Sequence, residues 1–347
     1  MSPRPPAVLL ILASIFFSAQ TAPVNTTTFP DAPFVVDPAD VQAAITCPKG
    51  QGKSAGGTVL LVHGTGSTGS ESFGTSPYIR DLPSAGNGFD VCFIDLPGRS
   101  IVDAQISGEF VAFVKYLPRS VLMLAKEVAN SKAIQLMAPQ SFNPQWALVF
   151  WPSTQALVSN YVALAPDFKG TIEGAIFSRV AAELCSDTGS GVLGCNALKL
   201  PTVQNTVGNG GGGQALVKTT AIFTVYDNVV QPESGPIVSS DLQGATVMAL
   251  QSPDNCGPTH LADHFSMLTD QAAFNMVSAA LTGSKFQKAS CLKLPDLDPA
   301  ALTNTVRSEL TDVLSILVAG KTPAEPDLQA SFSIRGIIFL TDSRLRW

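Results

Sequence analysis

Residues 57–69 read Gly-Thr-Val-Leu-Leu-Val-His-Gly-Thr-Gly-Ser-Thr-Gly, a short apolar run followed by small residues. The run 57–62 is typical of a central strand in a parallel sheet, because such a strand is covered on both faces and does not alternate between apolar and polar residues. Residues 63–69 contain three glycines and predict a flexible loop at the end of that strand. The segment therefore predicts a buried strand that leads into a glycine-rich loop.

Further apolar runs and helical patterns alternate along the rest of the chain. The expected strands are 89–96, 133–137, 161–165 and 221–226. The expected helices are 109–128, 145–151 and 296–320. This alternation predicts an α/β fold with a mostly parallel central sheet and helices on both faces. In such sheets ligands bind at the carboxyl ends of the strands, where Thr65, Asp167 and Asp227 fall.

The composition is that of a globular protein. The 347 residues are 45% hydrophobic and 14% charged, with a formal net charge of -6. This length suffices for one large α/β domain, which we expect, or for two small ones. The negative charge does not fit an electrostatic partnership with nucleic acid.

The N-terminus predicts export from the cell. Arg4 precedes an apolar run over 7–17, and small residues follow it, which is the pattern of a secretory signal peptide. The run is shorter than the roughly 20 apolar residues that a membrane span needs, and no later stretch is long enough. We expect a signal peptide over about 1–20 and a flexible mature N-terminus over 21–39, with a glycosylation sequon at Asn25.

The cysteine count fits the same compartment. A metal site would need CxxC-like or histidine-interleaved spacing, which is absent, so we predict disulfides and no metal. Cys185 and Cys195 enclose a Gly/Ser-rich turn that could close locally. The six cysteines are Cys47, Cys92, Cys185, Cys195, Cys256 and Cys291.

An acid and a histidine stand in the chain order of a hydrolase triad. Asp227 follows the expected strand 221–226, and His264 comes later. A triad needs the carboxylate to orient the imidazole and the imidazole to take a proton from the nucleophile. A structural role is the commoner explanation for such a pair, and His260 competes with His264. The remaining histidine, His63, lies on the loop after the first strand.

The chain resembles the Candida antarctica lipase B-like family of fungal secreted lipases, within the α/β-hydrolase superfamily, from about residue 40 to about residue 328. The resemblance implies one hydrolase domain over 40–328 and a divergent tail over 329–347. The matching stretches are Leu60-Leu61-Val62-His63-Gly64-Thr65-Gly66, Gln145-Trp146 through Pro152-Ser153, Ala165-Pro166-Asp167-Phe168-Lys169-Gly170-Thr171, Asp227 through Gln231-Pro232, Cys256-Gly257-Pro258 through Asp263-His264, and Glu325-Pro326-Asp327-Leu328.

The resemblance implies an extracellular lipase or carboxylester hydrolase that needs no cofactor. Its substrate would be a hydrophobic ester, met at a lipid–water interface, and the protein would be a monomer. Asp227 and His264 would be triad members, and Thr65 an oxyanion-hole donor. Two family disulfides would be Cys47–Cys92 and Cys256–Cys291, with Cys185–Cys195 an addition.

The substrate would contact one carboxyl group and an apolar wall. We expect Asp167 in the first role, and Val313 and Leu317 of the C-terminal helix in the second, because acyl chains need an apolar concave site. Ordinary core packing is the competing interpretation of that helix.

The chain departs from the family at the nucleophile. The family carries Thr-Trp-Ser-Gln-Gly at the turn before the Gln-Trp helix. Counting back from Gln145-Trp146 puts Ala138 at the serine position, Pro139 at the second oxyanion donor and Gln140 at the glycine. Alanine has no nucleophile and proline has no backbone N–H. Ser141 is the fallback nucleophile. Two interpretations follow: an inactive pseudoenzyme that binds lipids or esters, or a sequence that is wrongly specified around Ala138.

Overall fold

The computed structural model describes most of the expected domain. Its described residues are 31–50, 54–100, 104–113, 134–139, 142–169, 213–288 and 291. Several predictions fall outside these ranges: the signal peptide, Asn25, Ser141, the Cys185–Cys195 pair, Val313, Leu317 and the tail over 329–347.

A single seven-stranded sheet organises the described residues. Its spatial order is β1-β3-β2-β4-β5-β6-β7, in which β1 is antiparallel to β3 and every other pair is parallel. This confirms the predicted mostly parallel sheet. The strands are β1 (Ile45–Thr46), β2 (Thr58–Val62), β3 (Asp90–Ile94), β4 (Ile134–Pro139), β5 (Val158–Leu164), β6 (Thr219–Phe223) and β7 (Thr246–Ala249).

The two edge strands were not predicted from the sequence. β1 has two residues, which is too short for a recognisable pattern. β7 is partly exposed along its length, so it lacks the continuous apolar run that marks the inner strands. β6 also ends at Phe223, three residues before the predicted end of that strand.

Three of the described helices, α1, α2 and α9, begin at a residue whose side chain caps them. Asp270 caps α9 by accepting a hydrogen bond from the Ala273 N–H at 2.8 Å, and Gly283 ends that helix with a φ of 70°. α4 begins at residue 104, five residues before the predicted helix 109–128. The helices are α1 (Pro38–Ala44), α2 (Gly69–Phe73), α3 (Pro77–Asp81), α4 (Ala104–Ala112), α6 (Phe142–Phe150) and α9 (Gln271–Thr282).

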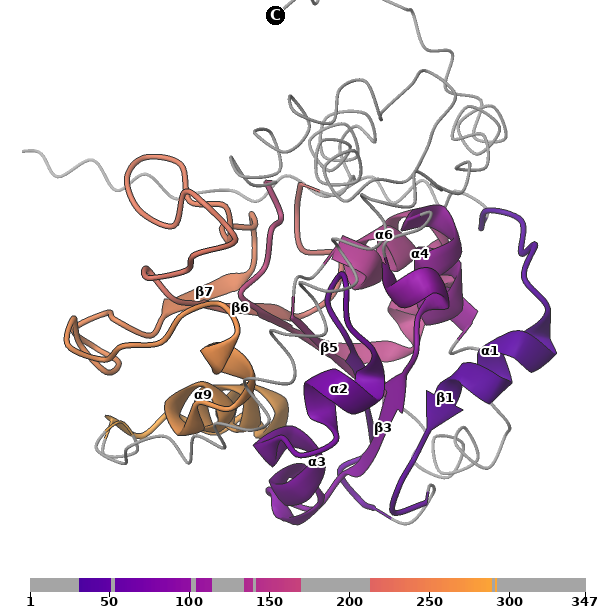
Figure 1. The fold of residues 1–347 in the computed structure, drawn as a ribbon, viewed down its shortest axis with the longest axis horizontal. Helices are drawn as coiled ribbons and strands as arrows, with labels where there is room; N and C mark the ends of the chain where they lie inside the picture. The colour runs from indigo at the N-terminus through magenta and orange to yellow at the C-terminus, as the bar shows by residue number, and fades with distance from the viewer. Residues whose placement is uncertain are drawn as a thin grey trace, which may run out of the picture.

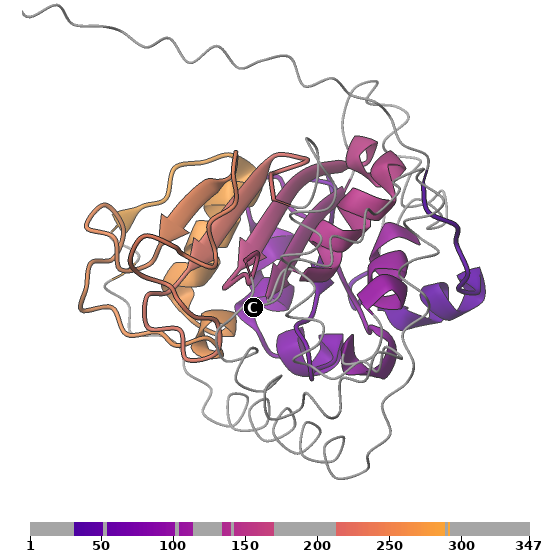
Figure 2. The same ribbon diagram turned by 90° about the horizontal axis from the view of Figure 1, so that it is seen from above.

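Helices cover both faces of the sheet, as Figures 1 and 2 show. Along β2, Leu60 and Val62 pack in the cluster that contains residues of α4 and α6. Val59 and Leu61 point the other way and pack with residues of α2, α3 and α9. Because successive side chains of a strand point to opposite faces, the apolar run of β2 supplies both cores. Within the described residues, no helix is long and apolar enough to span a bilayer.

The order of the strands reverses at β2. The chain runs from β2 to β3 on one side and then returns to β4 on the other side of β2. Ligands in open α/β sheets bind outside the carboxyl ends of the strands at such a reversal. The loop after β2 and the end of β4 therefore form the expected location of a site.

Candidate active site

Asp227 lies in a tight turn after β6 and is held by backbone N–H groups. Its Oδ1 atom accepts hydrogen bonds from Val229 N–H at 2.8 Å and Val230 N–H at 2.7 Å, and the residue is 3% exposed. The turn closes through the Asp227 N–H, which donates to the Thr224 carbonyl at 3.3 Å. The aspartate therefore stands four residues beyond the strand, not immediately after it as the sequence suggested, because β6 ends at Phe223.

His264 faces the second oxygen of that carboxylate. Its Nδ1 atom lies 2.8 Å from Asp227 Oδ2, and the residue is 5% exposed. The His264 N–H donates to Asn228 Oδ1 at 3.3 Å, which fixes the backbone of the histidine against the same turn. The two residues are 37 positions apart in the sequence. This is the carboxylate–imidazole arrangement in which the acid orients the ring.

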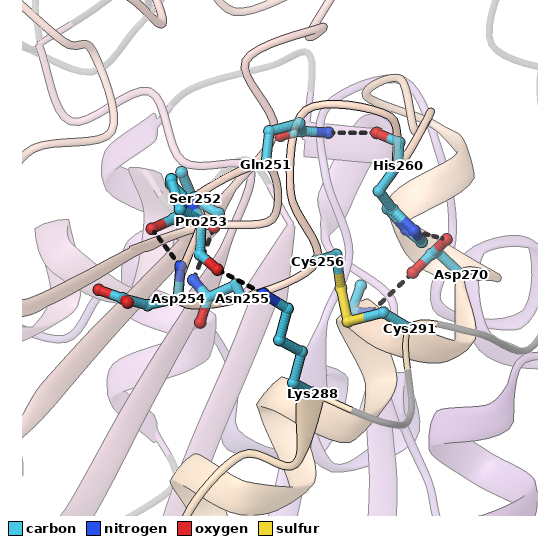
Figure 3. Close-up of a disulfide and its surroundings, with 12 residues drawn as sticks. Gln251, Ser252, Pro253, Asp254, Asn255, Cys256, His260, Asp270, Lys288 and Cys291 are labelled. Atoms are coloured by element: carbon cyan, nitrogen blue, oxygen red, sulfur yellow. Dashed lines mark hydrogen bonds and ion pairs between the residues drawn. A yellow bond between two sulfur atoms is a disulfide. The ribbon is translucent and has the colours of Figure 1, made fainter.

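His260, which competed for this role, has another partner. Its Nε2 atom lies 2.9 Å from Asp270 Oδ2, so it binds the capping residue of α9 (Figure 3). The disulfide Cys256–Cys291 is attached to the loop that carries His260, and Figure 3 shows it close to His260 and Asp270. We assign His260 to the support of the loop that carries His264.

A glutamine that sequence reasoning missed joins the Asp227 turn to the histidine loop. Gln251 accepts a hydrogen bond from Val225 N–H at 3.0 Å and donates to the His260 carbonyl at 2.8 Å. Thr224 Oγ1 donates to the Ala262 carbonyl at 2.6 Å and receives a hydrogen bond from Gln251 at 3.0 Å. A polar residue two positions after the partly exposed strand β7 gives no local sign of such a role.

Asp167 lies at the end of β5, beside the Asp227–His264 pair. Ala165 has a φ of 46°, a conformation that non-glycine residues rarely adopt, and it turns the chain out of the sheet. Burial raises the pKa of the Asp167 carboxyl to about 6, and the charge of Asp227 acts in the same direction, while His264 opposes it. Its Oδ1 atom is buried without a hydrogen-bond partner.

Glu233 is a second buried acid near the pair, and it was not singled out from the sequence. Its Oε1 atom lies 2.6 Å from Ser240 Oγ, which in turn lies 2.8 Å from the Pro166 carbonyl oxygen. Burial raises the pKa of Glu233 to about 8; the hydrogen bonds from Ser240 oppose this shift, the charge of Asp227 adds to it, and His264 lowers it.

The loop after β2 carries Thr65, the expected oxyanion-hole donor, in a half-buried turn. Gly66 N–H donates to the Arg99 carbonyl at 2.8 Å, and Arg99 Nε donates back to the Gly66 carbonyl at 2.9 Å. The Arg99 guanidinium also pairs with Glu71, whose side chain forms a capping box with Thr68 at the start of α2. These contacts give the loop a defined shape although its glycines suggested flexibility.

Ala138 and Pro139 are the last two residues of β4. They pair with Ala163 and Leu164 of β5, so the strand continues through both positions. The following helix, α6, begins at Phe142, three residues before the predicted helix 145–151. The structure brings the end of β4 next to the end of β2, where Leu61 pairs with Met137, and hence next to the loop of Thr65.

Other features of the site region are structural. Ser100 is buried and accepts a hydrogen bond from Asn143 Nδ2 at 2.7 Å. The described residues contain no cluster of three or more His, Cys, Asp or Glu side chains that could hold a metal ion. Cys47–Cys92 joins the residue after β1 to β3, so two of the three expected disulfides are present in the described residues.

Comparisons with known proteins identify the family. The chain is 30% identical over 312 residues to lipase B of Pseudozyma antarctica, a match that covers 83% of this chain and 82% of that protein. The crystal structure of Aspergillus fumigatus lipase B matches with a TM-score of 0.66 at 24% identity, covering 95% of this chain and 77% of that chain. No family model matches the chain. The fold and this similarity agree, and the chain belongs to the lipase B family of α/β-hydrolases.

Proposed function

We propose that this chain carries the site of a secreted lipase or carboxylester hydrolase that acts on hydrophobic esters, with a degenerate nucleophile position. The observation that supports the proposal most directly is the buried contact of 2.8 Å between His264 Nδ1 and Asp227 Oδ2 at the carboxyl edge of the sheet. Lipase B of Pseudozyma antarctica, to which the chain is 30% identical, is named for lipase activity.

The residues have distinct roles in this proposal. Asp227 accepts the Nδ1–H of His264 and stabilises the imidazolium that forms when the ring takes a proton. His264 is the general base and then the general acid. Thr65 donates to the developing oxyanion, and Asp167 contacts the substrate. Val313 and Leu317 would supply the apolar wall that an acyl chain needs.

Export is part of the same proposal. The N-terminal pattern predicts a signal peptide, and two disulfides are present in the structure. Disulfides persist in oxidising compartments, which supports secretion. We propose a monomer that meets its ester substrate at a lipid–water interface.

The identity of residues 138 and 139 favours a second function, an inactive protein that binds lipids or esters. Ala138 cannot form an acyl-enzyme, and Pro139 cannot donate a backbone hydrogen bond to an oxyanion. Loss of a triad nucleophile leaves only the acceleration that binding and the oxyanion hole provide, about 10³–10⁴-fold over water. The unmodified chain should therefore hydrolyse esters at or near background.

Restoring the family's residues at positions 138–140, where the nucleophile is expected, tests the proposal. We expect Ala138→Ser alone to recover little activity on a short-chain ester, because the oxyanion still lacks a backbone donor. The triple variant Ala138→Ser, Pro139→Gln, Gln140→Gly should exceed it by about 10²–10³-fold in kcat, the usual effect of one oxyanion donor. Adding Asp227→Ala or His264→Ala should remove the recovered activity.

Two results would contradict this assignment. Robust hydrolysis by the unmodified chain that Ser141→Ala abolishes would make Ser141 the nucleophile. A triple variant that folds and stays inactive, in a chain that still binds a long-chain ester analogue, would favour the ester-binding protein. Folding of each variant is checked by its thermal unfolding transition.

A further inference from the structure

The loop that follows Asp227 is attached to the segment that follows β5. Ser239 N–H donates to the Pro232 carbonyl at 2.8 Å, which closes residues 232–239 into a compact loop. Lys169 N–H donates to the Ser239 carbonyl at 3.2 Å, and Lys169 Nζ pairs with Asp241 at 2.8 Å. The two sides of the candidate site, one with Asp227 and one with Asp167, therefore meet through this loop.

The hydrogens at Ser240 decide the protonation of Glu233. Ser240 Oγ has two close oxygen neighbours, the Pro166 carbonyl at 2.8 Å and Glu233 Oε1 at 2.6 Å. A hydroxyl has one hydrogen to donate, and a carbonyl oxygen can only accept. If Ser240 donates to Pro166, the hydrogen in the shorter contact must come from Glu233. An ionised Glu233 would leave one of the two contacts with lone pairs facing each other.

The surroundings of Glu233 favour a neutral acid. Glu233 is 1% exposed and Ser240 is fully buried. Among the ion pairs of the described residues none includes Glu233. The charged groups that act on it are Asp227, which disfavours ionisation, and His264, which favours it. The Ser240 N–H also favours ionisation, because it donates to Glu233 Oε2 at 3.4 Å, but burial outweighs these effects. The Lys169–Asp241 pair on the two joined segments has opposite charges and is partly exposed to solvent.

We propose that Glu233 is held as a neutral carboxylic acid that donates to Ser240 Oγ, while Ser240 donates to the Pro166 carbonyl. This chain of two hydrogen bonds would make Glu233 a positioning residue for the Asp227–His264 pair, because it fixes the loop after Asp227 against the end of β5. The catalytic consequence rests on the proposed function. The hydrogen-bond chain rests on the geometry alone.

The protonation is measured directly by carbon NMR of protein labelled at glutamate carboxyl carbons. The resonance that disappears in Glu233→Gln identifies Glu233. We expect it to titrate near pH 8, far above the ordinary glutamate value of 4.5. A Glu233 carboxyl that is already ionised at pH 6 would overturn the proposal.

The pH dependence of the Tm should also show the titration of Glu233. The folded pKa of Glu233 exceeds the unfolded one, so its stabilising contribution is complete below about pH 4.5 and is lost as the pH rises through about 8. The amide of Glu233→Gln can still donate to Ser240 but does not titrate. From pH 6 to pH 9 we expect the Tm of the unmodified protein to fall relative to that of Glu233→Gln by roughly 3 °C or more.

A matched control separates this group from general charge effects. Asp254 is an exposed carboxylate, and Asp254→Asn should follow the pH profile of the unmodified protein. A parallel loss of Tm in Glu233→Gln and the unmodified protein would show that Glu233 does not titrate in this range and would contradict the proposal.

The positioning role has its own readout in the proton resonance of His264 Nδ1–H, assigned with His264→Gln. We expect exchange of this proton to accelerate more between pH 6 and pH 9 in the unmodified protein than in Glu233→Gln, whose acceleration reports only the base catalysis common to both proteins. We expect fast exchange at both pH values in Ser240→Ala. Unchanged exchange in Ser240→Ala would refute the positioning role. Ester hydrolysis enters none of these measurements, so a failure of the proposed function would be seen separately in the variants at positions 138–140.

Discussion

His63, His260 and His264 have different partners, and these partners separate their roles. His264 faces the Asp227 carboxylate, and His260 faces the carboxylate that caps α9. His63 lies between two backbone groups: its Nδ1 is 2.7 Å from the Gly64 carbonyl, and its Nε2 accepts from Leu96 N–H at 2.8 Å. The carbonyl requires a hydrogen on Nδ1 and the N–H requires a lone pair on Nε2, so His63 is neutral. It joins the loop after β2 to the end of β3.

The neutral His63 should make the protein sensitive to mild acid. Burial lowers its pKa from 6.5 to about 4, so between these values the unfolded chain takes up a proton that the folded chain does not. The contribution of the neutral His63 to the free energy of unfolding is fully present above pH 6.5. It falls by on the order of 3 kcal/mol as the pH drops toward 4. The urea midpoint at pH 7 and at pH 4.5 measures this.

His63→Gln is the variant that tests the cause. Its amide can keep one donor and one acceptor, and it does not titrate. We expect a smaller loss of stability between pH 7 and pH 4.5 than in the unmodified protein. An equal loss in both proteins would assign the acid sensitivity to other groups.

The loop after β2 is shaped by the turn after β3, an element with an unusual backbone. In the 3-10 turn η2 (Pro97–Ser100), Arg99 has a φ of 60° and Ser100 a φ of 58°, both in the left-handed region that favours glycine. This conformation allows the Arg99 carbonyl and side chain to bind both backbone groups of Gly66. We infer that the strained turn is retained because it holds the loop of Thr65 in place.

Replacing Arg99 by lysine should loosen this loop without unfolding the domain. Lysine cannot reproduce the Nε contact with Gly66 while pairing with Glu71, because its charge is a single point. A lost hydrogen bond of about 1 kcal/mol corresponds to roughly fivefold faster opening. Hydrogen exchange at the Gly66 amide measures this.

Glu71→Gln is the control for the Arg99 contacts. It weakens the ion pair but leaves the two contacts between Arg99 and Gly66, so the Gly66 amide should exchange at nearly the unmodified rate. Equal acceleration in both variants would mean that the ion pair, and not the contact with Gly66, holds the loop.

At the scale of the whole molecule, the two disulfides constrain different parts of the domain. Cys47–Cys92 links the short edge strand β1 to β3, with a sequence separation of 45 residues. Cys256–Cys291 encloses 35 residues and anchors the loop that leads to His260 and His264 (Figure 3). Cross-links of this kind stabilise by about 2–4 kcal/mol, chiefly by restricting the unfolded chain.

Removing either disulfide should lower the Tm, and only one of the two should affect His264. We expect both Cys47→Ser/Cys92→Ser and Cys256→Ser/Cys291→Ser to lower the Tm by at least about 4 °C. Only the second should speed the exchange of His264 Nδ1–H, because it frees the loop that carries His264. An effect of the first variant on that proton would show that the two regions are coupled.

The sequence by itself determined the inner sheet and its chemistry. Apolar runs identified the segments that became β2 to β6, because a strand buried on both faces carries its signal in consecutive residues. The glycine-rich loop of Thr65 and the position of Asp227 after a strand were also readable, since each is a property of a few neighbouring residues.

Only the tertiary structure decided which groups meet. The choice of His264 over His260 as the partner of Asp227 joins residues 37 positions apart, and no local pattern encodes that distance. The role of Gln251 and the neutral acid at Glu233 depend on burial and on partners from other strands. Ala138 and Pro139 lie in a strand because β5 pairs with them. Local composition determines which segments become strands and helices, whereas partners and protonation follow from how those segments pack.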